Sequence, residues 1–596
     1  MCGIAGMIGT ADHPPRVIPL AHRGPDAAGA ETFRAPIGST STLMHTRLAI
    51  VDLSPDGNQP ILNEDGRLAL VFNGEIYNHL DLRRRLSGLG HQFRSKMDGE
   101  VILHIYEQFG VDGFRMLNGI YAFALLDKET GDAVLVRDPV GVKPLFYTVR
   151  ADRSLVFASE PSAVVSLAGL PGDVDTQEIA RFLTFLWIPA PGSPFAGVCS
   201  LRPGHSLRRS GATWIEAPFE VVRPTAADLV DRPDDAAVDQ LRDEIRAAVS
   251  RQLMADVPVG AMASGGIDSS IIWAAGREGL ARCFTIEWSA DAAYAEKLDE
   301  DTSAVRRLES LLGTPVTYIP GKATSPIPDL LSGDLFADPA VELAKLIAEA
   351  ARAEHIKVLL SGQGGDELFG GYRRHQIARL VGAARVGRFG STAASMLQRT
   401  NSRSNRVEYA ARLSRALARS HPLDGYLELC SYSTATDRAT ALGCYESEVS
   451  DQVVWARHHE VFAELDPKLS FLRRVMALDL ALYLPGLGLA YCDRAGMHHG
   501  VEVRVPLLDL ELVRFSFTLT DRQLVGFPRP QSKPMLRAVA KSWLPSDVVD
   551  RPKRGFGAPM ESLPAGDKGS RGFRQNQYFA LALDALDVWK KSQLTR

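Results

Sequence analysis

The spacing of apolar residues changes once along this 596-residue chain. Before residue 160, short apolar segments alternate with turns, whereas after residue 238 apolar strands alternate with amphipathic helices. Such a chain is too long for one hydrophobic core, so the change predicts two domains of different class. We expect a first domain over 2–216, a Pro-, Asp- and Ala-rich linker over 217–237, a second domain over 238–565, and a peripheral tail over 566–596.

Composition limits the classes of partner. The net charge is -4 and the pI is near 6.4, which argues against a general nucleic-acid partner. Six cysteines without CxxC spacing indicate neither a disulfide framework nor a zinc site, and they favour the reducing cytoplasm. The start lacks a basic segment typical of a signal peptide, and no apolar run is expected to span a bilayer, so no membrane partner is expected.

Cys2 begins an apolar stretch at the start of the first domain. Removal of Met1 would place a thiol and a free α-amine on one residue. An amine with a pKa of about 7.7–8.0 can take the thiol proton, so nucleophile and base would share one residue. Cys2 alone would favour the simpler interpretation of an ordinary small residue after the start methionine.

Four polar clusters interrupt the first domain, at 22–26, 47–52, 72–78 and 98–103. Asn73-Gly74 inside the third cluster also fits a simple hairpin turn. The apolar pattern between the clusters predicts strands at Arg67–Phe72, Ile120–Leu126, Ala133–Arg137 and Ser154–Ala158, with helices at Leu80–Leu89 and Gly99–Phe109.

Taken in order, Cys-Gly-Ile-Ala-Gly, His-Arg-Gly-Pro-Asp, Arg-Leu-Ala-Ile-Val-Asp and Phe-Asn-Gly-Glu-Ile-Tyr-Asn resemble the glutaminase domain of class II glutamine amidotransferases. The resemblance implies an α+β N-terminal-nucleophile fold, an αββα sandwich of two antiparallel sheets. It also implies that Cys2 attacks the glutamine side-chain amide while Asn73 and the Gly74 backbone hold the oxyanion. Arg47 and Asn73, with Glu75 and Asp98 for the α-ammonium, would bind glutamine.

The second domain opens with an apolar strand that leads into Ser264-Gly265-Gly266-Ile267-Asp268-Ser269 and then an apolar helix. A small-residue loop at a helix N-terminus presents backbone N–H groups to an anion. The loop lacks Gly-Lys-Ser/Thr and is therefore no Walker A loop. Strand–helix alternation predicts an α/β doubly wound parallel sheet with its site at the carboxyl ends of the strands. Expected strands are Val257–Ala263, Arg282–Trp288, Pro315–Ile319 and Ile356–Leu360; expected helices are Val238–Leu253, Asp301–Leu312 and Val341–Glu354.

The Ser-Gly-Gly-x-Asp-Ser loop resembles that of ATP pyrophosphatases, and Ser361-Gly362-Gln363-Gly364-Gly365-Asp366 resembles the second motif of the asparagine synthase domain. Further matches lie at 493–497, 502–509 and 551–559. The whole chain thus resembles glutamine-hydrolysing asparagine synthetases. The resemblance implies ATP as cosubstrate and Mg²⁺ held by Asp268 and Asp366. The implied ATP-binding residues are Ala263, Ser264, Gly265, Gly266, Asp268, Ser269, Ile286, Ser361 and Gly362.

Several residues depart from the family pattern where the acyl acceptor is expected. Gln363 stands where the family has a carboxylate held to act as a base, and Arg494 and Tyr491 stand where relatives have lysines. The segment Gly333-Asp334-Leu335 replaces another acidic motif. Gln363 and Arg494 are nevertheless the expected catalytic positions of this domain, and Asp334, Glu367 or water would collect the proton that Gln363 cannot accept.

Three hypotheses follow from the resemblance. The first is an amidotransferase that hydrolyses glutamine, tunnels ammonia and amidates a carboxylic acid activated as acyl-AMP, either aspartate or, slightly favoured, a specialised acid. The second is a ligase that uses a substrate amine, like β-lactam synthetases or lasso-peptide cyclases; the third is a glutaminase-only protein. Intact Cys2, Arg47, Asn73 and Asp98 argue against the second, and intact Asp268 and Asp366 against the third. The expected partners are small molecules, with a homodimer as the possible assembly.

Overall fold

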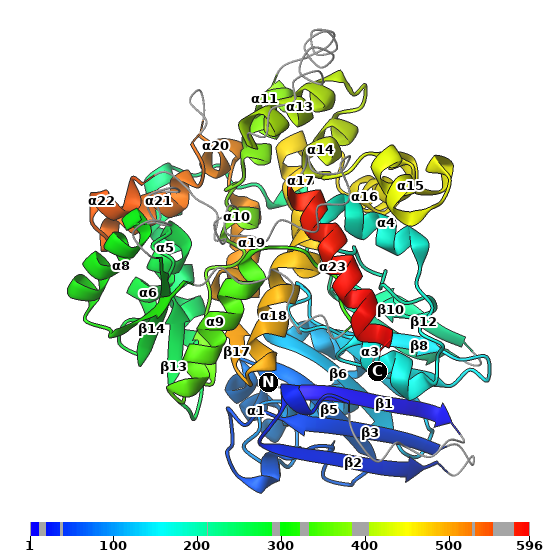
Figure 1. Cartoon of the computed structure of the whole chain (residues 1–596). Coiled ribbons are helices and arrows are strands. Elements are labelled where there is room, and N and C mark those ends of the chain that lie inside the picture. Colours follow the sequence, from blue (N-terminus) through cyan, green and yellow to red (C-terminus); the bar gives the residue numbers. More distant parts are fainter. Residues whose placement is uncertain are drawn as a thin grey trace.

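The computed structural model describes residues 2–10, 19–35, 40–210, 213–288, 299–321, 333–383, 405–526, 531–551 and 577–594. Its two domains are drawn in Figure 1, with the strands of the first in blue and cyan and most of the sheet of the second in green; the last strand of that sheet is orange. The motif at 551–559 lies outside the described residues except for Arg551.

Two six-stranded antiparallel sheets form the first domain, in the orders β10-β8-β9-β1-β3-β2 and β12-β11-β7-β6-β5-β4. The predicted strands and helices of this domain are all present, with ends shifted by a few residues. The bounds are β1 Cys2–Thr10, β2 Ala27–Arg34, β3 Thr40–Arg47, β4 Ile61–Leu62, β5 Leu68–Ile76, β6 Gly119–Asp127, β7 Ala133–Arg137, β8 Phe146–Val149, β9 Leu155–Ala158, β10 Cys199–Ser200, β11 His205–Ser210, β12 Thr213–Pro218, α1 His79–Gly88, α2 Glu100–Phe109, α3 Pro161–Ala168 and α4 Thr176–Phe185.

The sheets pack face to face, and helices cover both outer faces. Ile4 and Leu43 from one sheet share a buried cluster with Val71 and Ala124 from the other. On the outer face of the second sheet, Phe72 and Phe123 pack with Val101 of α2. Side chains of α3 and α4 belong to the cluster on the outer face of the first sheet. These four layers are the αββα sandwich that the sequence predicted.

The second domain is built on a parallel sheet in the order β15-β14-β13-β16-β17. All four of its strand pairs run parallel, as strand–helix alternation predicted. The bounds are α5 Asp234–Gln252, β13 Val259–Met262, α6 Ile267–Gly276, β14 Arg282–Glu287, α8 Asp299–Leu312, β15 Val316–Pro320, α9 Ala340–Ala353, β16 Val358–Leu360, α10 Gly365–Leu368, β17 Glu502–Arg504, α19 Leu510–Thr518, α20 Asp521–Leu524, α21 Pro534–Trp543 and α22 Ser546–Val549.

A helical layer follows α10. The run Phe471–His498 is long and apolar enough to cross a membrane, with a mean hydropathy of 1.6. The expectation that no segment reaches that length is therefore wrong. Of the 18-residue apolar stretch to which this hydropathy refers, 72% is buried inside the protein, as in the core helix of a globular domain. The bounds are α11 Arg373–Ala383, α13 Asn405–Ala418, α14 Pro422–Cys430, α15 Ala435–Leu442, α16 Asp451–Glu464, α17 Phe471–Leu478, the π-helix η6 Asp479–Gly488 and α18 Leu489–His498.

Helix α23, Gln577–Leu594, shows that the described part of the expected tail is not peripheral. It lies across the front of the molecule, from the helical layer toward the first domain (Figure 1). Trp589 is fully buried and its ring lies 5.2 Å from that of Phe195. Tyr578 at the other end contacts Tyr432 of the helical layer. The apolar face of α23 thus covers both domains.

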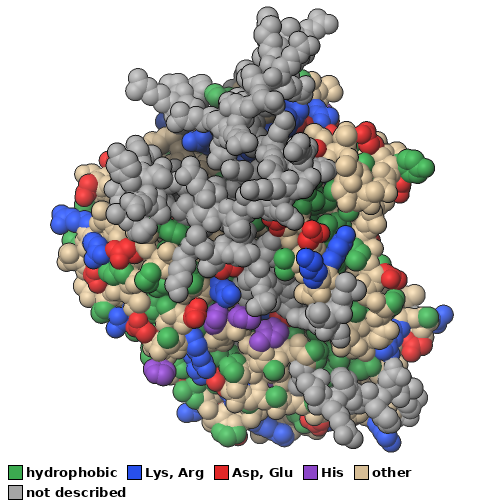
Figure 2. Space-filling model, viewed as in Figure 1, with side chains coloured by type: hydrophobic (Ala, Val, Ile, Leu, Met, Phe, Trp, Pro, Cys, Tyr) green, Lys and Arg blue, Asp and Glu red, His purple; other side chains and the backbone are tan. Residues whose placement is uncertain are grey.

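The surface carries no dominant charge on the face that Figure 2 presents, where Lys and Arg lie among Asp and Glu. This mixture agrees with the small net charge of -4. All six cysteines are free thiols in the structure, as their spacing predicted.

Buried ion pairs join the two domains beneath β1. Arg23, which is fully buried, contacts Glu160 at 3.2 Å and Asp493 of α18 at 2.8 Å. Arg494, the next residue of α18, contacts the same Glu160 at 2.5 Å and also pairs with Asp334. Burial alone would raise the pKa of Glu160, but Arg494 and His22 hold it below its ordinary value. Two arginines therefore offset most of the charge of three carboxylates at this interface, and His22 also contacts Glu160, at 2.8 Å.

Removing one member of this interdomain cluster is expected to destabilise the protein. Arg494→Met would leave Asp334 and Glu160 buried with less compensation, and breaking a buried pair typically costs about 3–5 kcal/mol. Arg514→Ala is the matched control, because Arg514 pairs with Glu220 of the linker but is 46% exposed, and its pair contributes about 0–1 kcal/mol. Calorimetry should show a lower thermal midpoint for Arg494→Met only; equal midpoints for both variants would contradict this reading.

Candidate active sites in the two domains

Cys2 is the first residue of β1, and the chain pairs it directly with Arg47 at the end of β3. Both side chains are buried, at 7% and 4% exposure. The Arg47 guanidinium donates to the Ser54 carbonyl at 2.7 Å and to Asn58 Oδ1 at 3.0 Å, so a loop fixes it. Burial raises the pKa of the Cys2 thiol. Ladder register thus places a thiol next to an anchored cation.

Asn73 and Gly74 lie on β5, where they adjoin Cys2. The backbone N–H of Cys2 donates to Asn73 Oδ1 at 3.0 Å. That bond occupies the amide oxygen and leaves Asn73 Nδ2 as a buried donor with no hydrogen-bond partner among the described residues. Gly74 has φ +150, and a Cβ there would lie 2.0 Å from the Ile120 carbonyl. Asn73-Gly74 is therefore part of a strand, and the alternative of a hairpin turn is wrong.

Glu75 and Asp98 are two buried carboxylates near Asn73. Asp98 Oδ2 accepts from the Ile76 N–H at 2.6 Å, while Glu75 contacts Arg504 of β17 at 3.2 Å. Burial, followed by repulsion from Asp98, raises the pKa of Glu75 well above its ordinary value. Burial also raises the pKa of Asp98. The pair is thus short of positive charge, although one of the two carboxylates already meets a cation of the other domain.

Most of the site residues predicted in the second domain line a cavity of about 630 Å³ at the carboxyl ends of β13, β14 and β16. Gly265 adopts φ +68, and a Cβ on Gly362 would lie 2.8 Å from the Ser269 N–H, so these glycines allow the two loops to meet. Ala263, which follows β13, is the only predicted ATP-binding residue absent from the lining. The lining includes Ser264, Gly265, Gly266, Asp268, Ser269, Ile286, Ser361, Gly362, Gln363 and Asp366.

Asp268 and Asp366 converge on one point of the cavity wall. The Lys533 ammonium lies 2.5 Å from a carboxylate oxygen of each. Lys533 is buried and adopts φ +56, an uncommon backbone conformation for a lysine, so the start of α21 holds this ammonium in place. One cation can therefore contact both carboxylates, which is what a bound divalent cation would require.

Gln363 also lines the cavity, where its Nε2 donates to Tyr491 Oη at 2.6 Å. Arg494 does not line the cavity: three residues beyond Tyr491 on α18, it points into the interdomain cluster. Asp334, which pairs with Arg494, is likewise outside. The residues that depart from the family pattern thus form two pairs. Gln363 and Tyr491 lie within the cavity, whereas Asp334 and Arg494 lie between the domains.

Several residues of the two sites had no role in the sequence-based prediction. Glu502 pairs with Arg504 at 2.5 Å and lies 3.9 Å from Lys143, which extends the contact of Glu75 across the interface. Glu502 and Arg504 belong to the stretch 502–509 that was noted only as a family match, so their positions were visible in the sequence but their contacts were not. Asp338 lines the cavity, and burial raises its pKa to about 6.

Comparisons with known proteins agree with this arrangement. A glutamine amidotransferase domain model matches residues 1–219, and an asparagine synthase model matches residues 240–596. Asparagine synthetase [glutamine-hydrolyzing] 1 of Bacillus subtilis is 27% identical over 94% of this chain and 87% of its own length. A putative asparagine synthetase [glutamine-hydrolyzing] of Mycobacterium tuberculosis is 30% identical over 92% of this chain and 84% of its own.

Among solved structures, a PRPP amidotransferase from B. subtilis covers 60% of this chain at 16% identity, and 81% of that chain is covered; the TM-score of 0.28 is too low to support an argument. The asparagine synthase model alone spans more than half of the sequence. The chain therefore belongs to the asparagine synthase family, with an N-terminal glutamine amidotransferase domain.

Proposed function

We propose that this protein hydrolyses glutamine at Cys2 and uses the ammonia to amidate a carboxylic acid that ATP has activated as an acyl-adenylate. One observation carries the proposal: α18 contacts both sites. Tyr491 and Cys492 line the ATP-loop cavity, while Asp493 and Arg494 join the cluster that reaches Cys2 through Arg23. Arg23 Nε donates to the Cys2 carbonyl at 3.3 Å. Ammonia released at Cys2 would then have to cross only the interface between α18 and the first domain.

In the first domain, Cys2 attacks the side-chain amide of glutamine. Asn73 Nδ2 and the Gly74 N–H stabilise the negative oxygen of the tetrahedral adduct; the buried Nδ2 without a partner supports this role. Arg47 binds the α-carboxylate of glutamine. Asp98 and Glu75 receive the α-ammonium, which supplies the positive charge that these buried carboxylates lack.

In the second domain, the N–H groups of the 264–269 loop and the start of α6 bind the pyrophosphate of ATP. Asp268 and Asp366 would hold Mg²⁺, which neutralises phosphate charge when bound, since their oxygens are the ligands that this ion prefers. Lys533 keeps the two carboxylates together and contributes a further positive charge to the phosphate site.

At the acceptor, Gln363 orients substrate through its hydrogen bond with Tyr491 and does not act as a base. Asp334 forms a buried ion pair with Arg494, so it is not available to accept the proton of the adduct. Asp338 lines the cavity and, with a pKa near 6, is mostly ionised at neutral pH, so it is the proton acceptor that we favour. The replaced pair of Gln363 and Tyr491 supports an acid other than aspartate as the substrate.

Cys2→Ala is expected to abolish glutamine-dependent amidation and leave ammonia-dependent amidation intact, because each domain holds a complete site. The two rates should be measured as amide product with glutamine or ammonium as donor. Cys199→Ala, another free thiol, is the matched control and should retain both. Protein that retains Met1 should resemble Cys2→Ala. Glutamine turnover by Cys2→Ala would refute the glutaminase assignment.

Asp366→Asn is expected to eliminate formation of AMP and pyrophosphate, because a neutral amide cannot replace the charge that the cation needs. Glutaminase activity should remain, which shows that the protein has folded. Asp239→Asn, on the exposed surface of α5, should retain both activities. If ADP and phosphate appeared as the products of wild type, the adenylation mechanism would be wrong.

Gln363→Glu separates a specialised acceptor from aspartate. If the substrate is a different acid, wild type should use aspartate poorly, and Gln363→Glu should not restore asparagine formation while Tyr491 still shapes the pocket. Amide product from aspartate is measured with ATP and ammonia saturating, and Gln376→Glu outside the cavity is the control. Efficient asparagine formation by wild type, raised by about 10²–10⁴ in Gln363→Glu, would instead identify an asparagine synthetase with a missing base.

A further inference from the structure

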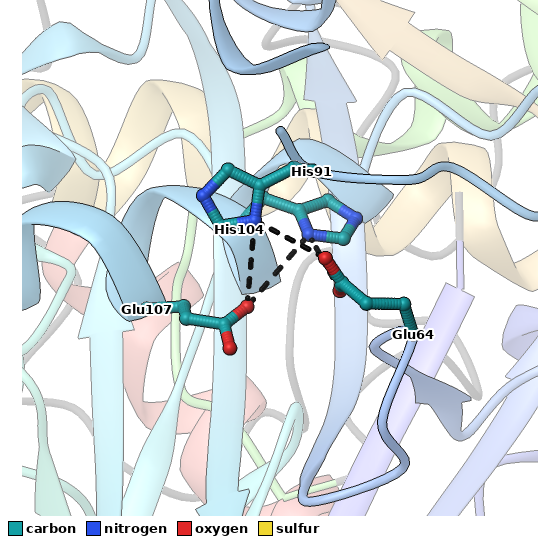
Figure 3. A group of neighbouring side chains, drawn as sticks. All are labelled: Glu64, His91, His104 and Glu107. Atoms are coloured by element: carbon teal, nitrogen blue, oxygen red, sulfur yellow. Dashed lines mark hydrogen bonds and ion pairs between the residues drawn. The ribbon is translucent and has the colours of Figure 1, made fainter. Parts of the chain in front are cut away.

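Four potential metal ligands converge on the first domain, away from both sites described above (Figure 3). Glu64 lies in the turn between β4 and β5, His91 follows α1, and His104 and Glu107 lie one turn apart on α2. One ligand atom of each residue lies within 4.8 Å of those of the other three. Three segments that are separate in the sequence therefore meet at one point.

The distances between these atoms are close to those of a tetrahedral metal site. Bonds of about 2.1 Å to nitrogen and oxygen place neighbouring ligand atoms about 3.4 Å apart. His91 Nδ1 lies 3.3 Å from Glu64 Oε1 and 3.5 Å from Glu107 Oε2. His104 Nδ1 lies 3.1 Å from Glu64 Oε2 and 4.0 Å from Glu107 Oε2. A small cation would need only minor side-chain movement to contact all four.

The ring nitrogens of His91 and His104 face oxygen atoms that can accept hydrogen bonds. His91 Nε2 lies 3.2 Å from Gln108 Oε1, which can accept a proton from Nε2; in that tautomer Nδ1 directs a lone pair at the two glutamates. His104 is fully buried. Its Nδ1 points at Glu64 and Glu107, and its Nε2 lies 3.9 Å from Glu100 Oε1. In the neutral form of both rings, lone pairs and carboxylate oxygens would therefore face one another around one point.

We propose that Glu64, His91, His104 and Glu107 bind a divalent transition-metal ion of the Zn²⁺ class. Two imidazole nitrogens with two carboxylates suit Zn²⁺, whereas Mg²⁺ and Ca²⁺ prefer ligand sets made only of oxygen. Glu100, which is fully buried beside His104 Nε2, is placed as the outer carboxylate that orients a metal-bound histidine.

Four protein ligands leave no open position, so the metal has a structural role. It ties the turn after β4 and the segment after α1 to the middle of α2. The first turn of α2 begins just after Asp98, so the metal also braces the loop that carries this carboxylate. Without a metal, protonation of both His91 and His104 would balance the charges of Glu64 and Glu107. The test below distinguishes this alternative from metal binding.

The test is titration of the metal-depleted full chain with Zn²⁺ in a calorimeter. Wild type should bind with a Kd below about 10 µM and melt at a higher temperature when loaded. Glu107→Gln, which changes a solvent-exposed ligand, should weaken this binding at least about tenfold, and His91→Gln should do the same. Mg²⁺ should not compete.

Glu129→Gln is the matched control, because Glu129 is an exposed glutamate of the same domain outside the cluster, and it should bind like wild type. Circular dichroism establishes that each variant has folded. Co²⁺ provides a second readout, since the visible absorption of tetrahedral Co²⁺ should appear in wild type and be lost in Glu107→Gln. Absence of saturable Zn²⁺ binding, or equal binding by Glu107→Gln and Glu129→Gln, would overturn the proposal and leave protonated histidines as the explanation.

Discussion

Charge neutralisation between the domains is the constraint on which both sites depend. Arg23 and Arg494 are buried against Glu160, Asp493 and Asp334, and none of these ions is tolerated there without its partners. The same arginine that meets α18 also donates to the Cys2 carbonyl. Any rearrangement that separates the domains would therefore expose or unbalance charges next to the nucleophile.

A second set of contacts repeats this design on the other side of the first site. Glu75 lies among residues predicted to bind glutamine, yet it forms an ion pair with Arg504, at the end of a strand of the second domain. Arg504 in turn pairs with Glu502, whose pKa burial would raise but Arg504 lowers to about 2. The proposed glutamine site thus contacts the other domain, through charged residues of β17 at the edge of the parallel sheet.

The local pattern of apolar and turn residues was sufficient to predict the secondary structure, which depends on neighbours in the sequence. The strand before Ser264 and the parallel direction of the second sheet follow from apolar spacing and turn residues, whereas the two antiparallel sheets of the first domain were implied by the family resemblance. Partners distant in sequence could not be predicted in this way: Arg494 was expected at the acceptor, but its contact with Glu160 joins residues 334 positions apart. Burial of Trp589 and convergence of Glu64 with His104 likewise depend on tertiary packing, which periodicity does not record.

Helix α18 has one further consequence, which concerns divergence within the family. Tyr491 lines the cavity, while Arg494, just under one turn further along α18, contacts Glu160 of the first domain. Substitutions on the cavity side can change which acid is accepted without disturbing the charges that hold the ammonia source in place. A family built on such a helix can acquire new acceptors while its nitrogen donor stays the same.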